Sequence, residues 1–387
     1  MKGQNFSVAS RSSKLNVGMI VRLSLALLVT LGSIALAWIM LGMTRAHAAG
    51  VIETPTQATP WAVAFDKSSH VWVAEPGCDA EPNCTTTFPS YIGQYNRTNG
   101  ALVKNFKEPT GFSSPVFLLV DKHGNIWFSE PTTNAIGRLT PVTITGLPAW
   151  KQWKVPTASA NPYDLVLDNN GNIWFTEYSA DKIGFFNTTT KTFVETTIAT
   201  AGSLPYGITK DAAGTIWFAE SAAQKIGSFT PTTTGTITIK EYVINIAGGP
   251  IPHLIVADSA GTLWYSEGFS GDIGSYNPTT KAHNNINVSI GACPSPTPGV
   301  TPTPCPTKTH ISGIGVDSTG RIWYDDSLNA IVGVYNPTSA ALKTLTLSNL
   351  NAHPYDGLAV DSNNNTWFTE EFASPSGNLG KIPVGTL

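Results

Sequence analysis

Charged residues are scarce in this chain of 387 residues, where they make up 13% of the sequence, about half the share in an average soluble domain. Ser, Thr, Asn, Gly and Pro take their place, which fits a soluble all-β protein. Lysine and arginine form no basic patch or stripe, so nucleic acid is not expected as a partner. No phosphate-binding loop, Gly-x-Ser-x-Gly or His-Glu-x-x-His motif occurs, so the common nucleotide and hydrolase signatures are missing.

Long apolar runs are missing too, except for one near the N-terminus. Four basic residues precede an uncharged run over 23–43, and Ala46-His47-Ala48 follows it as a small-residue cleavage site. Residues 1–48 are therefore a signal peptide or, if uncleaved, a membrane anchor over 20–43. Both alternatives predict a secreted or extracytoplasmic protein whose only contact with a membrane is this segment.

Cysteine is limited to four residues, which lie in two insertions of the sequence. The simplest pairing is local and predicts the disulfides Cys78–Cys84 and Cys293–Cys305. The second pair lies in a Pro/Thr-rich stretch at about 291–308. Proline cannot donate to a sheet ladder, so this stretch is expected to be a disordered surface loop.

What the sequence does contain is one unit that occurs seven times. Each copy has an Asp and, six residues later, a Trp, followed by an acid three residues after the Trp. The Asp–Trp pairs are Asp66/Trp72, Asp121/Trp127, Asp168/Trp174, Asp211/Trp217, Asp258/Trp264, Asp317/Trp323 and Asp361/Trp367. Seven copies at a period of 43 to 59 residues indicate a repeat architecture.

The third copy shows how one unit is expected to fold. An apolar run over 162–167 is followed by the turn sequence Asp-Asn-Asn-Gly and by Ile-Trp-Phe-Thr, which predicts two strands joined by a hairpin. A third strand begins at Lys182-Ile-Gly184, and a fourth lies over 192–198. Four antiparallel strands per repeat predict an all-β, seven-bladed β-propeller over residues 49–387.

The two ends of the chain predict how the ring closes. The last copy ends at its third strand, near residue 383, and lacks a fourth. Residues 51–55 read as a fourth strand that stands ahead of the first copy. We therefore expect the N-terminal strand to complete the last blade, which removes an open sheet edge.

The repeated acids are expected to be structural, because a catalytic site is usually formed once rather than seven times. The Asp of each copy should form the hairpin turn. The acid after each Trp should bond backbone groups between blades; these acids are Glu75, Glu130, Glu177, Glu220, Glu267, Asp326 and Glu370.

Residues that break the repeat carry more information about function. The position after the Pro that opens a blade is aromatic in several copies; its occupants include Trp61, Val116, Tyr163, Tyr206, His253 and Tyr355. The innermost strands begin near one end of the propeller axis. An aromatic rim is expected there, suited to a small-molecule or peptide-like ligand that bears rings. We expect the protein to be a monomer.

Three of the seven histidines, His253, His310 and His353, open three consecutive blades. They are expected to lie side by side in one sector of this rim. Three interpretations stay open: hydrogen-bonded rim histidines, a catalytic or metal-assisted site, and a three-His metal site. Four acids that depart from the repeat could orient a histidine or hold a divalent cation, namely Asp164, Asp325, Asp356 and Glu371.

Several motifs resemble those of the virginiamycin B lyase (streptogramin lyase) family. They are Pro-Tyr-Gly-Ile-Thr at 205–209, Gly-Asn-Ile-Trp-Phe-Thr-Glu at 171–177 and Asn-Ala-Ile-Gly-Arg-Leu-Thr at 134–140. The resemblance implies a seven-bladed propeller that opens the ring of type B streptogramins by elimination and requires Mg²⁺. It also implies a catalytic set: a His in Pro-His-x-Ile, a Glu-Pro-His in the next blade, and a Glu four residues after that blade's Trp.

Carried onto this chain, the set matches in part. His253 matches the first His, and His310 stands for the second in Lys308-Thr309-His310. Ser327 lies four residues after Trp323, with Asp326 as the nearest acid. In the last blade Glu371 lies four residues after its Trp, in an alternative alignment that places His353 at the Glu position.

We predict His253, His310 and Asp326 as catalytic residues, with Glu371, Asp325 and His353 as ligands of Mg²⁺. The function that follows is a C–O lyase that opens a cyclic depsipeptide ester. A non-catalytic binding propeller for a glycan or peptide and a lactonase-like hydrolase are the alternatives, because propellers support many activities.

Overall fold

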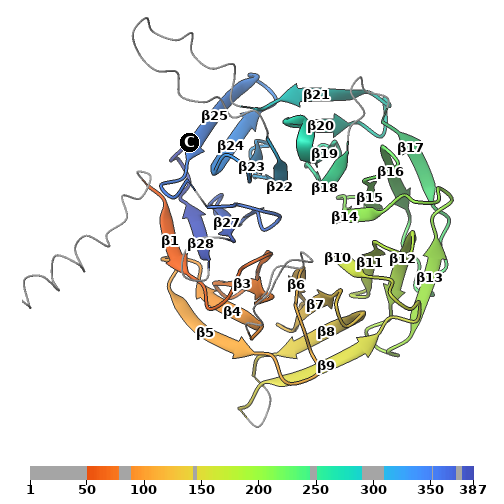
Figure 1. The fold of residues 1–387 in the computed structure, drawn as a ribbon. Helices are drawn as coiled ribbons and strands as arrows, with labels where there is room; N and C mark the ends of the chain where they lie inside the picture. Colours follow the sequence, from red (N-terminus) through yellow and green to blue (C-terminus); the bar gives the residue numbers. More distant parts are fainter. Residues whose placement is uncertain are drawn as a thin grey trace, which may run out of the picture. The chain divides into compact units, whose positions relative to one another are not determined.

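The computed structural model describes residues 50–77, 89–142, 146–244, 251–289, 309–350, 352–371 and 377–387. These residues form seven four-stranded antiparallel sheets around a common axis, as Figure 1 shows, so the predicted seven-bladed β-propeller is confirmed. The one helical element described is the 3₁₀ turn η1 (Gly268–Ser270), and no helix in these ranges has the length and apolar character to cross a membrane. The leader, both cysteine pairs and the Pro/Thr-rich insertion lie outside the described residues.

Each blade takes its strands in chain order from the axis outward, except that the outermost strand of blade 7 comes from the start of the propeller. The strands of blade 1 are β2 (Val63–Phe65), β3 (His70–Glu75), β4 (Tyr91–Asn96) and β5 (Leu102–Lys107), and those of blade 2 are β6 (Leu118–Val120), β7 (Ile126–Glu130), β8 (Ala135–Thr140) and β9 (Ala149–Lys154). Blade 3 holds β10 (Pro162–Leu167), β11 (Ile173–Glu177), β12 (Lys182–Phe186) and β13 (Phe193–Thr197), and blade 4 holds β14 (Pro205–Lys210), β15 (Ile216–Glu220), β16 (Lys225–Phe229) and β17 (Lys240–Val243).

The remaining blades follow the same order. Blade 5 holds β18 (Pro252–Ala257), β19 (Leu263–Glu267), β20 (Asp272–Tyr276) and β21 (His283–Asn287). Blade 6 holds β22 (Ile311–Val316), β23 (Ile322–Asp326), β24 (Ile331–Asn336) and β25 (Ala341–Thr346). Blade 7 combines β26 (Ala359–Val360), β27 (Thr366–Glu370) and β28 (Asn378–Ile382) with β1 (Ile52–Pro55) from the start of the propeller.

The ring closes as the sequence predicts. β1 pairs antiparallel with β28, with Ile52 opposite Lys381 and Pro55 opposite Asn378. The N-terminal strand is therefore the outermost strand of the last blade, and the edge of β28 is covered.

The constant spacing between Asp and Trp has a direct cause. In blade 1 the Asp66 carboxylate accepts backbone N–H groups of the hairpin, including that of His70 at 2.9 Å. Its other oxygen accepts the indole N–H of Trp72 at 3.1 Å. The Trp–Asp bond recurs in all seven blades, at 2.8 to 3.2 Å. Each Asp thus holds the turn and orients the Trp that follows it.

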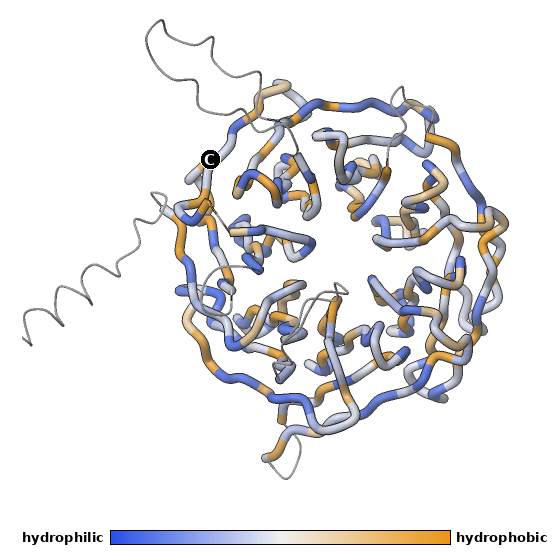
Figure 2. The backbone as a smooth tube through the Cα atoms, in the orientation of Figure 1, coloured by the Kyte–Doolittle hydropathy of each residue, from blue (hydrophilic) through white to orange (hydrophobic). Residues whose placement is uncertain are grey.

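The tryptophans then join neighbouring blades. The ring centroids of Trp174 in blade 3 and Phe229 in blade 4 are 4.7 Å apart, and Trp127 of blade 2 lies 5.8 Å from Phe186 of blade 3. The second strands from β7 to β27 are buried along their whole length. Figure 2 shows hydrophobic and hydrophilic residues alternating along the chain, which places part of each strand in these inter-blade cores.

The acids after the Trp differ in what they contact. Glu75 accepts the backbone N–H groups of Gln57 and Ala58 at 2.9 and 3.1 Å, in the connection that leads from blade 7 into blade 1. Glu130 accepts that of Ser113 at 2.9 Å in the next connection. The predicted bonding of backbone between blades is confirmed for these two acids. In Glu177 and Glu220, by contrast, neither carboxylate oxygen has a hydrogen-bond partner among the described residues.

Candidate active site

The innermost strands of several blades share a β-bulge, and this bulge positions the residues of the predicted rim. In blades 3, 4 and 5 the opening Pro pairs with the acid at the end of the second strand, and the register shifts just after it. A bulge of this kind re-aims the side chain it contains. Tyr163, Tyr206 and His253 occupy this position, so the bulge turns consecutive blades' aromatic side chains toward one another.

The side chains of the aromatic rim contact one another through their rings. The rim consists of Trp61, Tyr163, Tyr206, His253 and Tyr355. Tyr163 and Tyr206 have centroids 4.5 Å apart, and Tyr206 stacks on His253 at 3.8 Å. Trp61 meets Tyr355 edge to face at 5.2 Å, and Tyr355 lies 6.4 Å from His253. The predicted rim residues are therefore neighbours in the structure.

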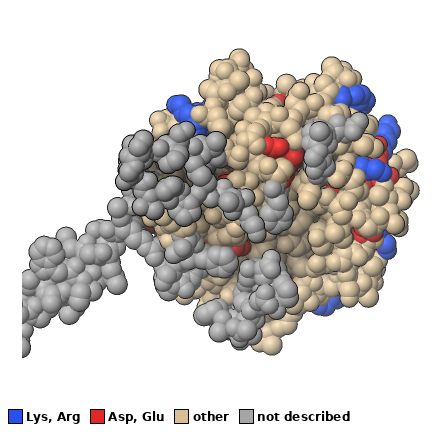
Figure 3. Space-filling view, turned by 45° about the horizontal axis from the view of Figure 1, so that its top comes forward, with Lys and Arg blue, Asp and Glu red and all other residues tan. Residues whose placement is uncertain are grey.

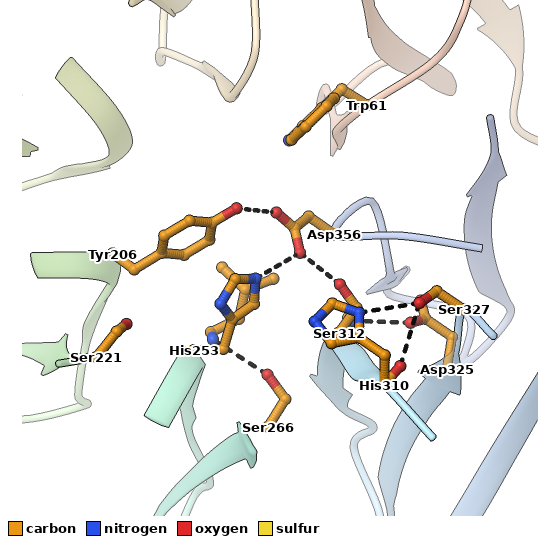
Figure 4. A network of polar contacts seen from close by, with 12 residues as sticks. Trp61, Tyr206, Ser221, His253, Ser266, His310, Ser312, Asp325, Ser327 and Asp356 are labelled. Atoms are coloured by element: carbon orange, nitrogen blue, oxygen red, sulfur yellow. Dashed lines mark hydrogen bonds and ion pairs between the residues drawn. The ribbon is translucent and has the colours of Figure 1, made fainter. Parts of the chain in front are cut away.

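Asp356 is the centre of the polar contacts in the rim, as Figure 4 shows. Its Oδ1 accepts from Nε2 of His253 at 3.0 Å and from the hydroxyl of Ser312 at 2.6 Å. Its Oδ2 accepts from the hydroxyl of Tyr206. The Asp356 side chain is fully buried, whereas that of His253 is 12% exposed. Four blades' strands or loops thus meet at one carboxylate.

These contacts decide the charge of Asp356. Burial alone would raise the pKa of this carboxyl, but the charge of His253 and the hydrogen bonds from His253, Ser312 and Tyr206 bring the pKa below its usual value. Asp356 is accordingly an anion that holds His253 in one orientation. Asp356 is one of the four acids that depart from the repeat, and it orients a histidine as the sequence predicts.

A second group, formed by His310, His353, Tyr355 and Glu371, adjoins the first. Tyr355 lies between the two histidines and stacks on both, at 5.5 Å from His310 and 5.3 Å from His353. Nδ1 of His353 contacts Glu371 Oε2 at 2.9 Å. The centroid of His310 is 5.9 Å from that of His253, so the three histidines do lie in one sector, as predicted.

His310 differs from His253 in its surroundings. Its Nδ1 meets the hydroxyl of Ser327 at 2.9 Å. Burial and the charge of His253 lower the pKa of His310 to about 4, although Asp356 opposes the shift. The imidazole is therefore neutral near pH 7.

The predicted metal ligands do not form one set. Asp325 is buried against Gly313, whose N–H it accepts at 2.8 Å, and Glu371 pairs with His353. Asp326 accepts the backbone N–H of His310 at 3.1 Å, the structural role of its position in the repeat. Among the described residues, no three His, Cys, Asp or Glu side chains are arranged to hold a metal ion. The described residues therefore form no site that fits Mg²⁺.

The register of blade 6 also corrects the predicted alignment. Ile311 pairs with Asp326 as Pro252 pairs with Glu267, so Ser312, not His310, holds the strand position of His253. Blade 6 has no Pro to mark this position in the sequence, and Ser312 was missed for that reason. His310 precedes the strand but still directs its ring toward Tyr355 and His253.

Comparison with known proteins agrees with this architecture. The sequence model described as the Virginiamycin B lyase family matches residues 28–296, well over half of the chain. The chain belongs to the virginiamycin B lyase family. The match ends before blade 6. No curated protein matches the chain.

Among solved structures, a streptogramin B lyase is 23% identical, with a TM-score of 0.67 over 86% of this chain and 96% of the other. A catalytically inactive virginiamycin B lyase from Staphylococcus aureus, with quinupristin, is 22% identical with the same TM-score, over 86% and 98%. A periplasmic gluconolactonase from Pseudomonas aeruginosa is 13% identical, with a TM-score of 0.56 over 77% and 87%. At these identities the likeness shows a shared fold.

Proposed function

We propose that this member of the family is an extracytoplasmic carbon–oxygen lyase that opens a cyclic depsipeptide ester by elimination, with His253 as the base. One observation carries the proposal: the ring of His253 is fixed between Tyr206 and a buried, ionised Asp356, and its edge remains partly exposed at the rim. A histidine oriented by a carboxylate is the usual arrangement of a general base.

The contact with Asp356 determines which nitrogen reacts. Nε2 carries the proton that it donates to Asp356, so Nδ1 is the basic nitrogen. Among the described residues, none hydrogen-bonds to Nδ1 of His253. Nδ1 is thus available to a ligand that enters past the aromatic rim.

The reaction is an elimination in which atoms and electrons balance. Nδ1 takes the proton from the carbon next to a carbonyl of the ester-bearing residue. The electron pair of that C–H bond forms a carbon–carbon double bond, and the ester oxygen leaves as a carboxylate with the electrons of the broken C–O bond. No water is consumed, so ring opening leaves the mass unchanged.

The neutral His310 is assigned a different part. With a pKa of about 4 its imidazole is uncharged at neutral pH, and we assign it no proton transfer in this reaction. Its ring forms a wall of the site together with Tyr355. His253 is assigned as the base because its ring is paired with the carboxylate of Asp356.

The first test is to incubate the full-length chain with quinupristin, with and without Mg²⁺, and to follow the compound by chromatography with mass detection. A new peak of unchanged mass is expected, and it should vanish in His253→Ala. A gain of one water would instead identify a hydrolase on the same scaffold. No change under either condition would contradict the lyase. The two arms with and without Mg²⁺ test the metal requirement that the family resemblance implies.

A second candidate, a ligand-binding propeller without catalysis, is favoured by Ser312. This serine occupies a strand position equivalent to that of His253, and its hydroxyl is used by Asp356. If the rim only binds, calorimetry will detect the ring-bearing ligand while its mass and retention stay unchanged. His253→Ala would then weaken binding by loss of a stacking partner for Tyr206 rather than abolish a reaction.

A further inference from the structure

Trp61 differs from the tryptophans of the repeat in the hydrogen bonding of its indole N–H. All seven repeat tryptophans donate this group to an Asp of their own hairpin. Trp61 is only 3% exposed, and yet its Nε1 has no hydrogen-bond partner among the described residues. It is the one tryptophan in the described part of the chain with a buried Nε1 that lacks an acceptor. A buried donor of this kind is rare and calls for an explanation.

The unpaired N–H faces the candidate active site. Figure 4 shows the nitrogen end of the Trp61 indole turned toward the bond between Tyr206 and Asp356. The hydroxyls of Tyr206 and Ser312 are already donated to Asp356. The Trp61 N–H is therefore a donor at this place that the protein itself does not use. An indole N–H only donates, so its missing partner is a hydrogen-bond acceptor.

The position of Trp61 is fixed from both sides. Its backbone N–H donates to Ala74 O at 2.8 Å, and its carbonyl accepts the hydroxyl of Thr369 from β27 at 3.1 Å. A Cβ on Gly357 would lie 2.2 Å from the Trp61 oxygen, so glycine is needed there for the first and last blades to approach. The donor is thus held rigidly, which is what stabilisation of a developing charge requires.

We propose that the Trp61 indole N–H binds the carbonyl oxygen of the ester-bearing residue and stabilises the negative charge that forms on it when His253 removes the neighbouring proton. The inference rests on the proposed lyase function. It names the group that stabilises the enolate oxygen in a site where the described acids do not form a metal-binding cluster. Its ligand class is a ring-bearing compound with a carbonyl next to an acidic C–H bond.

Trp61→Phe is the variant that separates the N–H from the ring. It keeps an aromatic side chain against Tyr355 and removes the N–H donor together with one ring of the indole. With quinupristin we expect kcat to fall about a hundredfold, the usual effect of losing one oxyanion donor, with little change in KM. The matched control is Trp264→Phe, which removes an indole N–H bonded to Asp258 in the hairpin of blade 5; this variant should keep the parent kcat.

The direct readout is the indole N–H signal of Trp61 in a nitrogen-15 NMR spectrum of the full chain, assigned by its loss in Trp61→Phe. The probes are quinupristin, added to a His253→Ala background that leaves it intact, and N-acetylphenylalanine methyl ester. We expect the Trp61 signal to move downfield with either probe, because the N–H gains an acceptor. A signal that moves with neither probe overturns the inference.

The outcomes distinguish this inference from the proposed function. If the parent opens quinupristin and Trp61→Phe is equally fast, the inference is wrong and the lyase stands. If the parent does not open quinupristin, the lyase fails, and the NMR titration alone decides whether Trp61 is a carbonyl-binding donor. A loss in Trp61→Phe together with a shifted signal supports both.

Discussion

Asp356 shows how one buried carboxylate can organise side chains from several blades. It accepts hydrogen bonds from Tyr206, His253 and Ser312, which stand on β14, β18 and β22. In blade 3, Pro162 pairs with Glu177 and Val166 pairs with Trp174. In blade 7, Pro354 pairs with Glu370 and Ala359 pairs with Trp367. The innermost segment of blade 7 is therefore one residue longer between these two pairs. The extra residue lets both Tyr355 and Asp356 reach the rim.

Asp356→Asn is expected to lower kcat for ring opening about a thousandfold, by analogy with losing the acid of a His–Asp pair. The amide has the shape of the carboxylate but no charge, and its N–H₂ opposes the donors that surround it. The measurement is kcat with quinupristin at pH 7, with circular dichroism to verify the fold.

The control for this substitution is Asp325→Asn on the neighbouring blade. Burial raises the pKa of Asp325 well above its ordinary value, so this carboxyl is already neutral and an amide replaces it closely. Asp325→Asn should keep kcat within about threefold of the parent. Equal losses in the two variants would contradict the role assigned to Asp356.

Part of this site was predictable from the sequence because it departs from a strict repeat. His253, His310 and His353 stand out in consecutive blades, and Asp356 and Glu371 stand out as extra acids beside them. The pairing His253–Asp356 needed the structure because it joins blades 5 and 7 across the axis, and the pairing His353–Glu371 needed it because it depends on the register within blade 7. Ser312 could not be found because its strand has no opening Pro, and the unpaired N–H of Trp61 has no sequence signal.

At the scale of the strand, the recurrent Ile-Gly pair has a steric explanation. Gly184 on β12 lies opposite Phe175 on β11, and a Cβ on Gly184 would be 2.1 Å from Phe175 Cζ. The ring of Phe175 occupies the space above the glycine. The same relation holds for Gly227 under Phe218, so in blades 2 to 7 the glycine and the aromatic residue after the Trp form one packing unit.

Gly184→Ala is therefore expected to destabilise the propeller by about 3 kcal/mol, the upper part of the range for overpacked cores. The ring of Phe175 must move into the inter-blade core to make room for the methyl group. Urea unfolding followed by tryptophan fluorescence measures the change. The double variant Phe175→Leu/Gly184→Ala should recover part of the loss, whereas additive losses would show that the two residues do not compete for space.

Strand number and order could be predicted because each repeat carries the same turn and the same Trp. The repeat Asp forms the hairpin turn and also accepts the Trp indole N–H, and only the first of these roles could be predicted from the sequence. Turn formation follows from Asp-x-x-Gly, but acceptance of the Trp indole N–H depends on the side chains' directions across the hairpin. The bulges after Pro162, Pro205 and Pro252 were likewise invisible, because no residue type marks them.

For the whole molecule, closure by β1 supports the site as well as the ring. β28 pairs with β1 on one side and β27 on the other, and Thr369 of β27 holds the carbonyl of Trp61. A chain that begins at Thr56 should therefore lose thermal stability, self-associate through the open edge of β28, and lose kcat. Size-exclusion chromatography, thermal unfolding and the quinupristin assay compare it with a chain that begins at Ala48. Equal behaviour of the two would show that β1 is dispensable.

The buried acids give the whole propeller an unusual dependence on pH. Burial raises the pKa of Glu75, Glu130 and Glu267 to about 7. Burial and the charge of Glu195 raise that of Glu177 to about 8, and burial and the charge of Glu241 raise that of Glu220 to about 8. Figure 3 shows that basic residues in this view lie mostly along the edge of the face.

The direction of the effect follows from linkage. An acid with a raised pKa in the folded state binds its proton more tightly than the unfolded chain does. Its contribution to stability is complete below the unfolded pKa of about 4.3 and is lost as the pH rises through the folded values of 7 to 8. The hairpin residues Asp121 and Asp361 act in the opposite sense, because hydrogen bonds outweigh burial and lower their pKa, so their contribution is lost in acid.

The two groups together predict maximum stability near pH 5 and a fall in Tm of at least about 5 °C between pH 5 and pH 8. Differential scanning calorimetry across this range measures it. Glu177→Gln/Glu220→Gln is the matched variant, because an amide stays neutral at every pH, as the protonated carboxyl does at pH 5. This variant should equal the parent at pH 5 and exceed its Tm at pH 8. A Tm that rises from pH 5 to pH 8 in the parent would mean that these acids are ionised in the folded propeller, with partners supplied by water.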